Sequence, residues 1–272
     1  MYGGSGLYSK RREVENKRKI WLYFFLGIFS AAGILAGLWS GPRYPELLIS
    51  NINVSGNNAV KEGLIKNSVA NNITGVFYIF FPKNNSLWFP KETIEETLLK
   101  DYPRLATASV GLKDLKNIEV RVTEREAKDL YCKGEKENPT NCYFVDNRGF
   151  IFAEAPSFTG SVYKRFFSTT TEFVIGQQVM LRPDFEAITQ FSDALSKNGL
   201  NVNSVFMDKD SLKLGLEDGG EIILSNASGA NSALDNLLIL LKSNDFKGRS
   251  GDGKLKFQYI DLRFGNKVYY KI

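Results

Sequence analysis

The chain has 272 residues, 43% of them hydrophobic, which suits one or two domains with buried cores and excludes a disordered protein. It contains no histidine, which excludes Ser-His-Asp catalysis, Cys-His catalysis and histidine metal sites. The net charge is +5, but residues 1–19 hold six basic and two acidic residues, so the rest of the chain is nearly neutral, unlike a nucleic-acid-binding domain.

An uncharged, mostly apolar segment, IWLYFFLGIFSAAGILAGLW, occupies residues 20–39. As a helix it rises about 30 Å, which matches the hydrocarbon thickness of a bilayer. We therefore predict a transmembrane helix over residues 20–40. The basic tail of residues 1–19 precedes it, which favours a cytoplasmic N-terminus and export of the remaining chain.

A cleaved signal peptide is the main alternative to an anchor. Its apolar region normally has about 7–15 residues and a small-x-small cleavage site. Here the apolar run is longer and is followed by Trp39-Ser40-Gly41-Pro42-Arg43. A buried core helix is a second alternative, but it would lie directly beside a basic tail. The pattern favours an uncleaved anchor.

Residues 47–125 predict a small domain with the element order strand, helix, helix, strand, strand. Two amphipathic patterns mark its helices, and Pro103 stops the second. Two helices on a small mixed sheet can enclose one core. Between the helices, residues 76–90 are rich in aromatics, including Phe80, Phe81, Trp88 and Phe89. They indicate either a cover for the helix pair or a surface that faces a partner or the membrane.

Residues 126–272 predict a larger α+β domain with a mainly antiparallel sheet. Strands are expected at 127–132, 142–147, 150–154, 162–167, 202–207, 211–216, 221–225, 256–263 and 267–271. The segments RPDFEAITQFSDALSKNGL and NSALDNLLILLKSND predict two amphipathic helices. Their apolar faces comprise Phe185, Ile188, Phe191 and Leu195 in the first and Leu234, Leu237, Leu238 and Leu241 in the second.

The two cysteines, Cys132 and Cys142, end apolar runs on either side of a polar segment rich in turn formers. Two strands closed by this loop would bring the sulfurs together. In an exported domain we expect a disulfide that contributes about 2–3 kcal/mol, the alternative being two buried free thiols.

Four stretches in collinear order behind an anchor resemble the FtsQ/DivIB family of bacterial cell-division proteins. INVSGNNAV resembles the opening strand and turn of its POTRA domain, and YPRLATASVGLKDLKNIEVRVTEREA resembles the closing hairpin of that domain. YFVDNRGFIF and YIDLRFGNKVYY resemble the first hairpin and the last strands of its β domain. The longer aromatic segment, the cysteine pair and the short C-terminal end depart from the family pattern.

The resemblance implies a single-pass protein of the cytoplasmic membrane that acts at the division septum. Its partners would be small coiled-coil proteins of the FtsB and FtsL type, and its role would be control of septal peptidoglycan synthesis. It implies no reaction, no cofactor, no metal and no small-molecule substrate.

The candidate binding site is the last strand, which has no later strand to cover its outer edge. Such an edge can accept a strand from a partner, and in the resembling family this strand accepts FtsB. The candidate partner-binding residues are Arg263, Phe264, Lys267, Val268, Tyr269 and Tyr270, around a turn at Gly265-Asn266. Which of the two tyrosines faces the partner stays open at this level.

Other polar groups predict structural roles. We interpret Glu124-Arg125-Glu126 as a strand end with local ion pairing, and expect Asp261 and Arg263 to pair with each other or with a neighbouring strand. Asp208-Lys209-Asp210 lacks the later ligands of a calcium loop. A POTRA-containing export or assembly protein and a membrane-anchored cell-wall enzyme remain the alternative functions.

Overall fold

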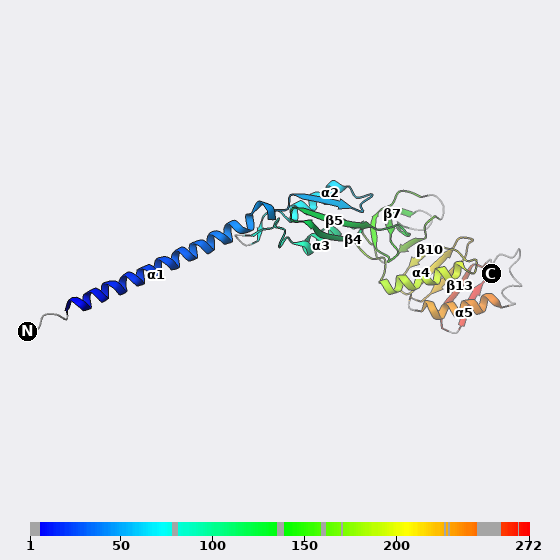
Figure 1. Ribbon diagram of the computed structural model, residues 1–272. Helices are drawn as coiled ribbons and strands as arrows, with labels where there is room; N and C mark the ends of the chain where they lie inside the picture. Colours follow the sequence, from blue (N-terminus) through cyan, green and yellow to red (C-terminus); the bar gives the residue numbers. More distant parts are fainter. Residues whose placement is uncertain are drawn as a thin grey trace, which may run out of the picture. The chain divides into compact units, whose positions relative to one another are not determined.

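A computed structural model of the chain describes residues 6–77, 81–134, 139–158, 162–169, 171–225, 227, 229–243, 257–265 and 267–272 (Figure 1). Side chains are described from residue 17 onward, except that of Asn231. The fold is α+β and contains two compact units. Residues Met1–Leu98 with Ala108–Val122 form the first unit, and Leu99–Thr107 with Thr123–Ile272 form the second.

The N-terminal helix, α1, spans Gly6–Ser40. The segment Lys17–Arg43 contains an 18-residue window of mean hydropathy 1.9 and is long and apolar enough to cross a membrane. The helix begins well before residue 20, where the sequence pattern placed its start. Lys, Arg and Glu are good helix formers, and no proline interrupts the basic segment, so the helix continues through it.

The first unit continues through β1 (Asn51–Ser55), α2 (Glu62–Asn72), a short hairpin of β2 (Val76–Phe77) and β3 (Phe81–Pro82), α3 (Lys91–Asp101), β4 (Leu105–Asp114) and β5 (Asn117–Glu124). Its sheet has the order β1-β5-β4, and β1 runs parallel to β5. Buried positions recur at a spacing of four in both helices and of two in β5, so each element turns one face inward. The apolar residues of this unit that are fully buried are Ile65, Val69, Ile94, Leu98, Val110, Ile118 and Val120.

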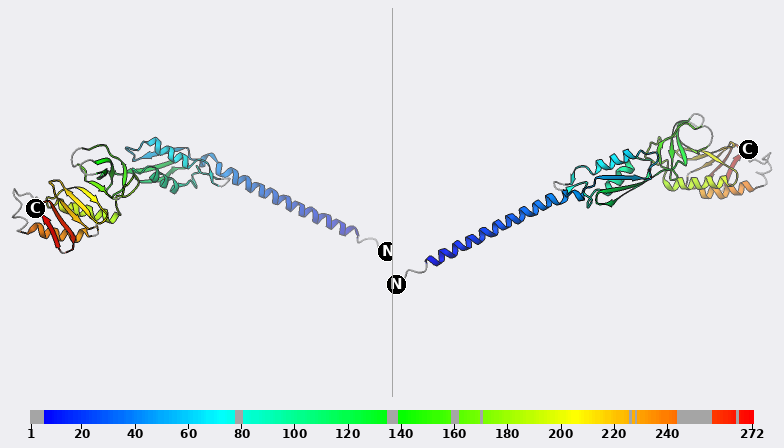
Figure 2. Two further views of the ribbon diagram at one scale, coloured as in Figure 1. Left: turned by 180° about the vertical axis from the view of Figure 1, so that it is seen from behind. Right: turned by 45° about the horizontal axis from the view of Figure 1, so that its top comes forward.

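The second unit is built on a nine-stranded sheet in the order β14-β13-β12-β11-β10-β9-β6-β7-β8 (Figure 2). The strands are β6 (Asp129–Gly134), β7 (Pro139–Val145), β8 (Ile151–Glu154), β9 (Arg165–Ser168), β10 (Val202–Met207), β11 (Leu212–Leu216), β12 (Glu221–Leu224), β13 (Tyr259–Phe264) and β14 (Lys267–Lys271). The pairings β6–β9, β9–β10 and β12–β13 are parallel, and the other neighbours are antiparallel. The sheet is therefore mixed, and antiparallel pairings outnumber the parallel ones.

Two of the three parallel junctions arise where a helix connects the paired strands, whereas β6 and β9 are connected through β7 and β8. The helix α4 (Arg182–Ser196) separates β9 from β10, and α5 (Ala230–Lys242) separates β12 from β13. Each crossover returns the chain in its original direction, as a helical connection between parallel strands requires. The sequence pattern predicted where the strands lie, whereas the relative direction of β9 and β10, and of β12 and β13, depends on these crossovers.

One face of the sheet packs against α4 and α5. The predicted apolar face of α4, comprising Phe185, Ile188, Phe191 and Leu195, is confirmed as fully buried. In α5, Leu237 and Leu241 are buried and Leu234 packs against the same core at partial exposure. Alternate residues of the central strands, such as Val205, Leu214 and Ile222, complete this core.

The loop Asp146–Gly149 between β7 and β8 is organised by one carboxylate. The Oδ1 of Asp146 accepts hydrogen bonds from the backbone N–H groups of Arg148 and Phe150 at 2.8 and 2.9 Å. Its Oδ2 lies 2.6 Å from Nη1 of Arg125, whose guanidinium lies 4.0 Å from the centroid of the Phe150 ring. The strand β5 ends at Glu124, as the predicted strand end requires, and the ion pair of Arg125 is made with this loop rather than with a neighbour in the sequence.

We predict that Asp146→Ala destabilises the second unit by about 3 kcal/mol, because it leaves two partly buried N–H groups and the Arg125 guanidinium without their partner. Hydrogen exchange of the β7 and β8 amides in the full chain measures this loss. Asn147→Ala changes an exposed residue of the same loop and serves as the control. Equal protection in the two variants would contradict the role of Asp146.

Candidate partner-binding edge

The strand β14 ends the nine-stranded sheet. It pairs with β13 on one side, and no described strand lies on its other side (Figure 2, red). Alternate backbone N–H and C=O groups of such a strand point away from the sheet and can bind another strand. The sequence analysis placed the candidate site on this strand, and the structure places the strand at the sheet edge.

The β13–β14 hairpin contains an irregular register. Asp261 pairs with Tyr269, but Phe264 pairs with Lys267, so β13 has one extra residue between these two pairs. Such a bulge bends the strand and increases its twist. The hairpin is held to α5 by Asn236, whose Nδ2 donates a hydrogen bond to the carbonyl oxygen of Gly265 at 2.8 Å. Asn266, the second residue of the predicted turn, lies outside the described residues.

The two tyrosines of β14 face opposite sides of the sheet. Val268 and Tyr270 pack at partial exposure against the core that α4 and α5 cover. Tyr269 is 50% exposed, and its ring lies edge to face with that of Phe264, the ring centroids being 5.3 Å apart. Since alternate side chains of a strand point to opposite faces, Tyr270 packs inward and Tyr269 is available to a partner.

Arg263 pairs with Asp261 along the same strand. Its Nη2 lies 2.7 Å from Oδ2 of Asp261, and its Nε donates to Oδ1 at 2.9 Å. The side-chain hydrogen bonds from Arg263 hold the pKa of the Asp261 carboxyl below its ordinary value, although burial acts in the opposite direction. Of the six candidate residues, Val268 and Tyr270 thus face inward, and Phe264 and Tyr269 face outward. Lys267 begins β14, and Arg263 is paired with Asp261.

We predict that Arg263→Gln raises the pKa of Asp261 toward the ordinary value of about 4. The pKa of this carboxyl is depressed in the folded chain, so the pair stabilises the fold above the unfolded-state pKa, and this contribution is lost as the pH falls through the folded-state pKa. Carboxyl NMR titration of Asp261 in the two proteins checks this. An unchanged pKa would contradict the assignment of Arg263 as its cause.

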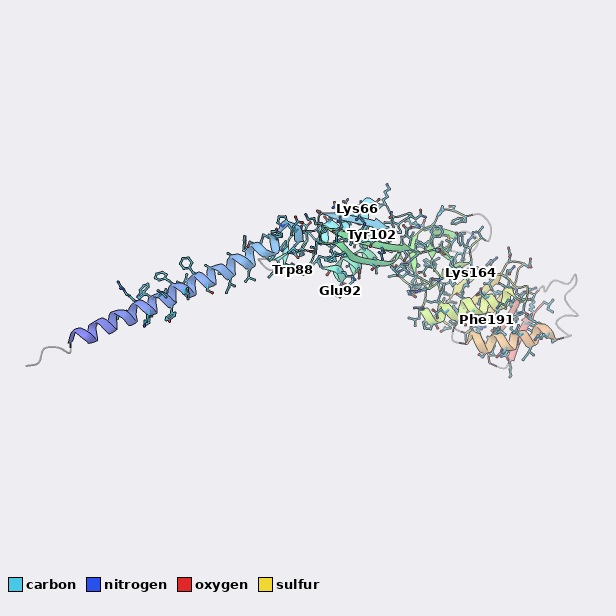
Figure 3. All side chains as sticks on the ribbon, in the orientation of Figure 1. Lys66, Trp88, Glu92, Tyr102, Lys164 and Phe191 are labelled. Carbon is cyan, nitrogen blue, oxygen red and sulfur yellow. A yellow bond between two sulfur atoms is a disulfide. The ribbon has the colours of Figure 1, made fainter. Side chains whose placement is uncertain are left out.

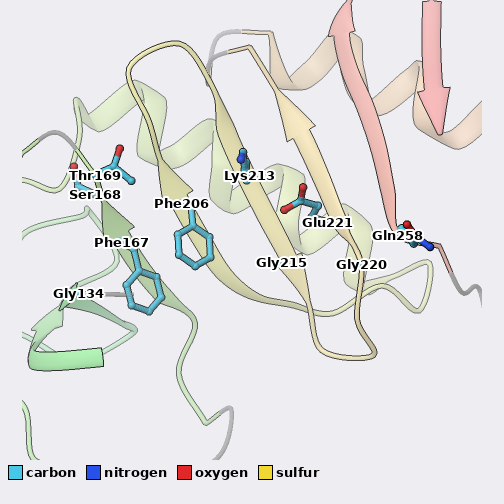
Figure 4. Close-up of a pocket in the computed structure, with 10 residues that line it drawn as sticks. All are labelled: Gly134, Phe167, Ser168, Thr169, Phe206, Lys213, Gly215, Gly220, Glu221 and Gln258. Atoms are coloured by element: carbon cyan, nitrogen blue, oxygen red, sulfur yellow. The ribbon is translucent and has the colours of Figure 1, made fainter. Parts of the chain in front are cut away.

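The sheet face opposite α4 and α5 carries a shallow groove of about 500 Å³ (Figure 4). Lys213 and Glu221 lie along it, and Gly215 and Gly220 also line it. Phe206 lines one end and stacks on Phe167 with ring centroids 4.8 Å apart. The sequence analysis missed this groove, since its lining residues come together only when β10, β11 and β12 are paired.

A disulfide joins Cys132 in β6 to Cys142 in β7, toward the other end of the sheet from β14. The two residues are direct partners in the antiparallel register. Cys132 belongs to a small apolar cluster on the face opposite the helices, with Leu130 and Phe167 as its other buried members. The disulfide therefore links two strands whose side chains form a second, minor core.

We predict that the double variant Cys132→Ala, Cys142→Ala lowers the free energy of unfolding of the second unit by about 2–3 kcal/mol, the amount expected for so short a loop. Amide exchange of β6 and β7 measures the loss. The reduced wild-type chain should show a similar loss, and no loss in either sample would contradict the prediction.

Neither the protein-family models nor the curated proteins contain a match to this chain.

Proposed function

We propose that the chain is a non-enzymatic scaffold of the bacterial division machinery, similar to the FtsQ/DivIB family. It binds a small coiled-coil protein of the FtsB or FtsL type by strand addition to β14, and so helps control septal peptidoglycan synthesis. The observation that carries the proposal is the position of β14 at the sheet edge, with Tyr269 exposed beside Phe264.

The helix α1 supports a membrane anchor. Its apolar stretch is long enough to cross a bilayer, and the basic residues precede it in the chain. In the proposed topology the basic tail lies in the cytoplasm, α1 crosses the membrane and the chain after about residue 40 lies outside it, because basic segments are retained on the cytoplasmic side. An oxidising exterior also suits the disulfide between Cys132 and Cys142.

The first unit supports a POTRA-like assignment. Its sheet order β1-β5-β4 and its two helices between β1 and β4 agree with the β-α-α-β-β arrangement expected from the resemblance. The hairpin β2–β3 is an addition to that arrangement. The proposed POTRA domain covers residues 47–125, and the proposed β domain covers residues 126–272.

Strand addition at β14 would use both kinds of contact that the edge offers. Outward backbone groups supply affinity for any extended segment, and the outward side chains select among segments. Tyr269 and Phe264 supply apolar area together with a phenol hydroxyl, a composition common at the centre of interfaces. The inward residues Val268 and Tyr270 hold the strand against the core and keep the edge in place before the partner binds.

We predict that Tyr269→Lys weakens binding of the FtsB/FtsL-type partner by about 2 kcal/mol or more, roughly a 30-fold rise in Kd. Binding of the full chain in detergent to the purified partner measures this. Leu181→Lys is the matched control, because Leu181 is 74% exposed and lies at the start of α4, away from β14. Tyr270→Lys is a poorer probe, since its ring packs on the core.

Hydrogen exchange of the β14 amides separates strand addition from other binding modes. A partner strand should slow exchange of the outward amides of β14, because they gain hydrogen bonds. Wild-type affinity in Tyr269→Lys, together with unchanged β14 exchange, would contradict the proposed site. Septal fluorescence of the tagged chain in dividing cells tests the proposed location, and a uniform membrane signal would count against it.

A further inference from the structure

Two segments that are distant in the sequence pack together directly after α1. The first is the linker of residues 41–49, which contains the 3₁₀ turns Gly41–Arg43 and Pro45–Leu47. The second is residues 81–90, the described end of the aromatic segment between α2 and α3. We call these two segments together the collar. Both belong to the first unit.

The collar is held by hydrogen bonds between its two segments. The side chain of Asn85, which is fully buried, donates from Nδ2 to the carbonyl oxygen of Pro42 at 2.7 Å. The backbone N–H of Ser86 donates to the carbonyl of Leu47 at 2.8 Å, and that of Ile49 donates to the carbonyl of Asn84 at 2.8 Å. A buried amide that bonds a linker carbonyl fixes where the loop lies relative to the chain that leaves α1.

Chain connectivity places the collar close to the end of α1. The helix ends at Ser40, and Pro42 follows two residues later, so the two lie at most about 7 Å apart. The headgroup layer on each side of a bilayer is about 5–8 Å thick. If α1 spans the membrane, the loop that bonds Pro42 therefore lies at or beside the headgroup layer. Figure 3 shows Trp88, a residue of this loop, near the end of α1.

The collar exposes apolar side chains where the headgroup layer would lie. Tyr44 is 59% exposed and Leu87 is 62% exposed, and each lies two residues from a partner of the Pro42–Asn85 hydrogen bond. Behind them, Trp88 packs edge to face on Phe81, with ring centroids 5.2 Å apart. A water-facing loop gains nothing from exposed Leu and Tyr, whereas the membrane interface accommodates both.

The end of α1 has the same interfacial chemistry. Trp39 lies in its last turn, and the guanidinium of Arg43 lies 4.1 Å from the centroid of the Trp39 ring. Nη1 of Arg43 also donates to the carbonyl oxygen of Trp39 at 2.8 Å. Aromatic rings and long basic side chains are the groups that anchor helix ends at the headgroups. The collar continues this belt from the helix onto the folded unit.

We propose that the collar is a lipid-binding surface that inserts Tyr44 and Leu87 into the headgroup layer beside α1. The inference rests on the membrane anchor of the proposed function and adds a second membrane contact made by the folded unit. Residues 81–90 then contact the membrane surface, and β14 remains available to bind the protein partner. The Asn85–Pro42 hydrogen bond joins the loop to the linker, so the first unit is held at the bilayer by two neighbouring contacts.

Photo-crosslinking in vesicles tests this surface directly. The full chain, with p-benzoylphenylalanine replacing Leu87, is reconstituted into vesicles of phosphatidylethanolamine and phosphatidylglycerol and irradiated. A second sample carries the photoreactive group in place of Tyr44. The matched control replaces Leu64, which is 47% exposed in the first turn of α2, in the same unit and outside the collar. Mass spectrometry counts lipid adducts at each position.

We expect lipid adducts at positions 87 and 44 in several times the yield found at position 64. Equal yields at all three positions would overturn the proposed lipid contact of the collar. A protein adduct at position 87 in cells, with no lipid adduct there, would also overturn it. Alkaline extraction of the same vesicles tests the anchor separately. A chain that is extracted lacks the anchor, and both proposals then fail. A chain that resists extraction but forms no lipid adduct retains the anchor and overturns the collar alone.

Discussion

The pairing of β13 with β14 is the constraint on which the candidate site depends. The strand β14 lies at one end of the sheet order, so one side of its backbone has no described neighbour. The inward packing of Val268 and Tyr270 and the hydrogen bond from Asn236 to Gly265 keep that edge in one conformation. A partner strand would therefore meet a template that is already ordered, which lowers the entropic cost of binding.

The two faces of the large sheet contribute in different ways. The face under α4 and α5 contains the main core, and it includes the inward residues of β14. The opposite face contains a minor cluster near the disulfide and a shallow groove over β10, β11 and β12. Stability thus comes mainly from one face, while the edge and the outward aromatic pair stay exposed to solvent. The disulfide strengthens β6 and β7, away from the edge that the partner would occupy.

In the first unit, too, the residues that form the core differ from those that bond other segments. Its helices bury Ile65, Val69, Ile94 and Leu98 over the small sheet. Asn85 and Ser86 bond the linker that follows α1. The aromatic segment had two interpretations from the sequence, as a helix cover or as an outward surface. The described aromatics Phe81, Trp88 and Phe89 are partly buried, while Leu87 is exposed, so the segment has both an inward and an outward side.

Local patterns in the sequence determined most of the elements. The apolar spacing of α4, the apolar length of α1 and the alternation around the cysteines each depend on neighbouring residues, so the sequence alone revealed them. Only the tertiary structure decided the relations between distant residues: the parallel junctions of the sheet, the pairing of Arg125 with Asp146 across 21 positions and the contact of Asn85 with Pro42 across 43. It also decided that Tyr270 packs inward and Tyr269 outward, because a strand pattern gives alternation but does not say which face meets the helices.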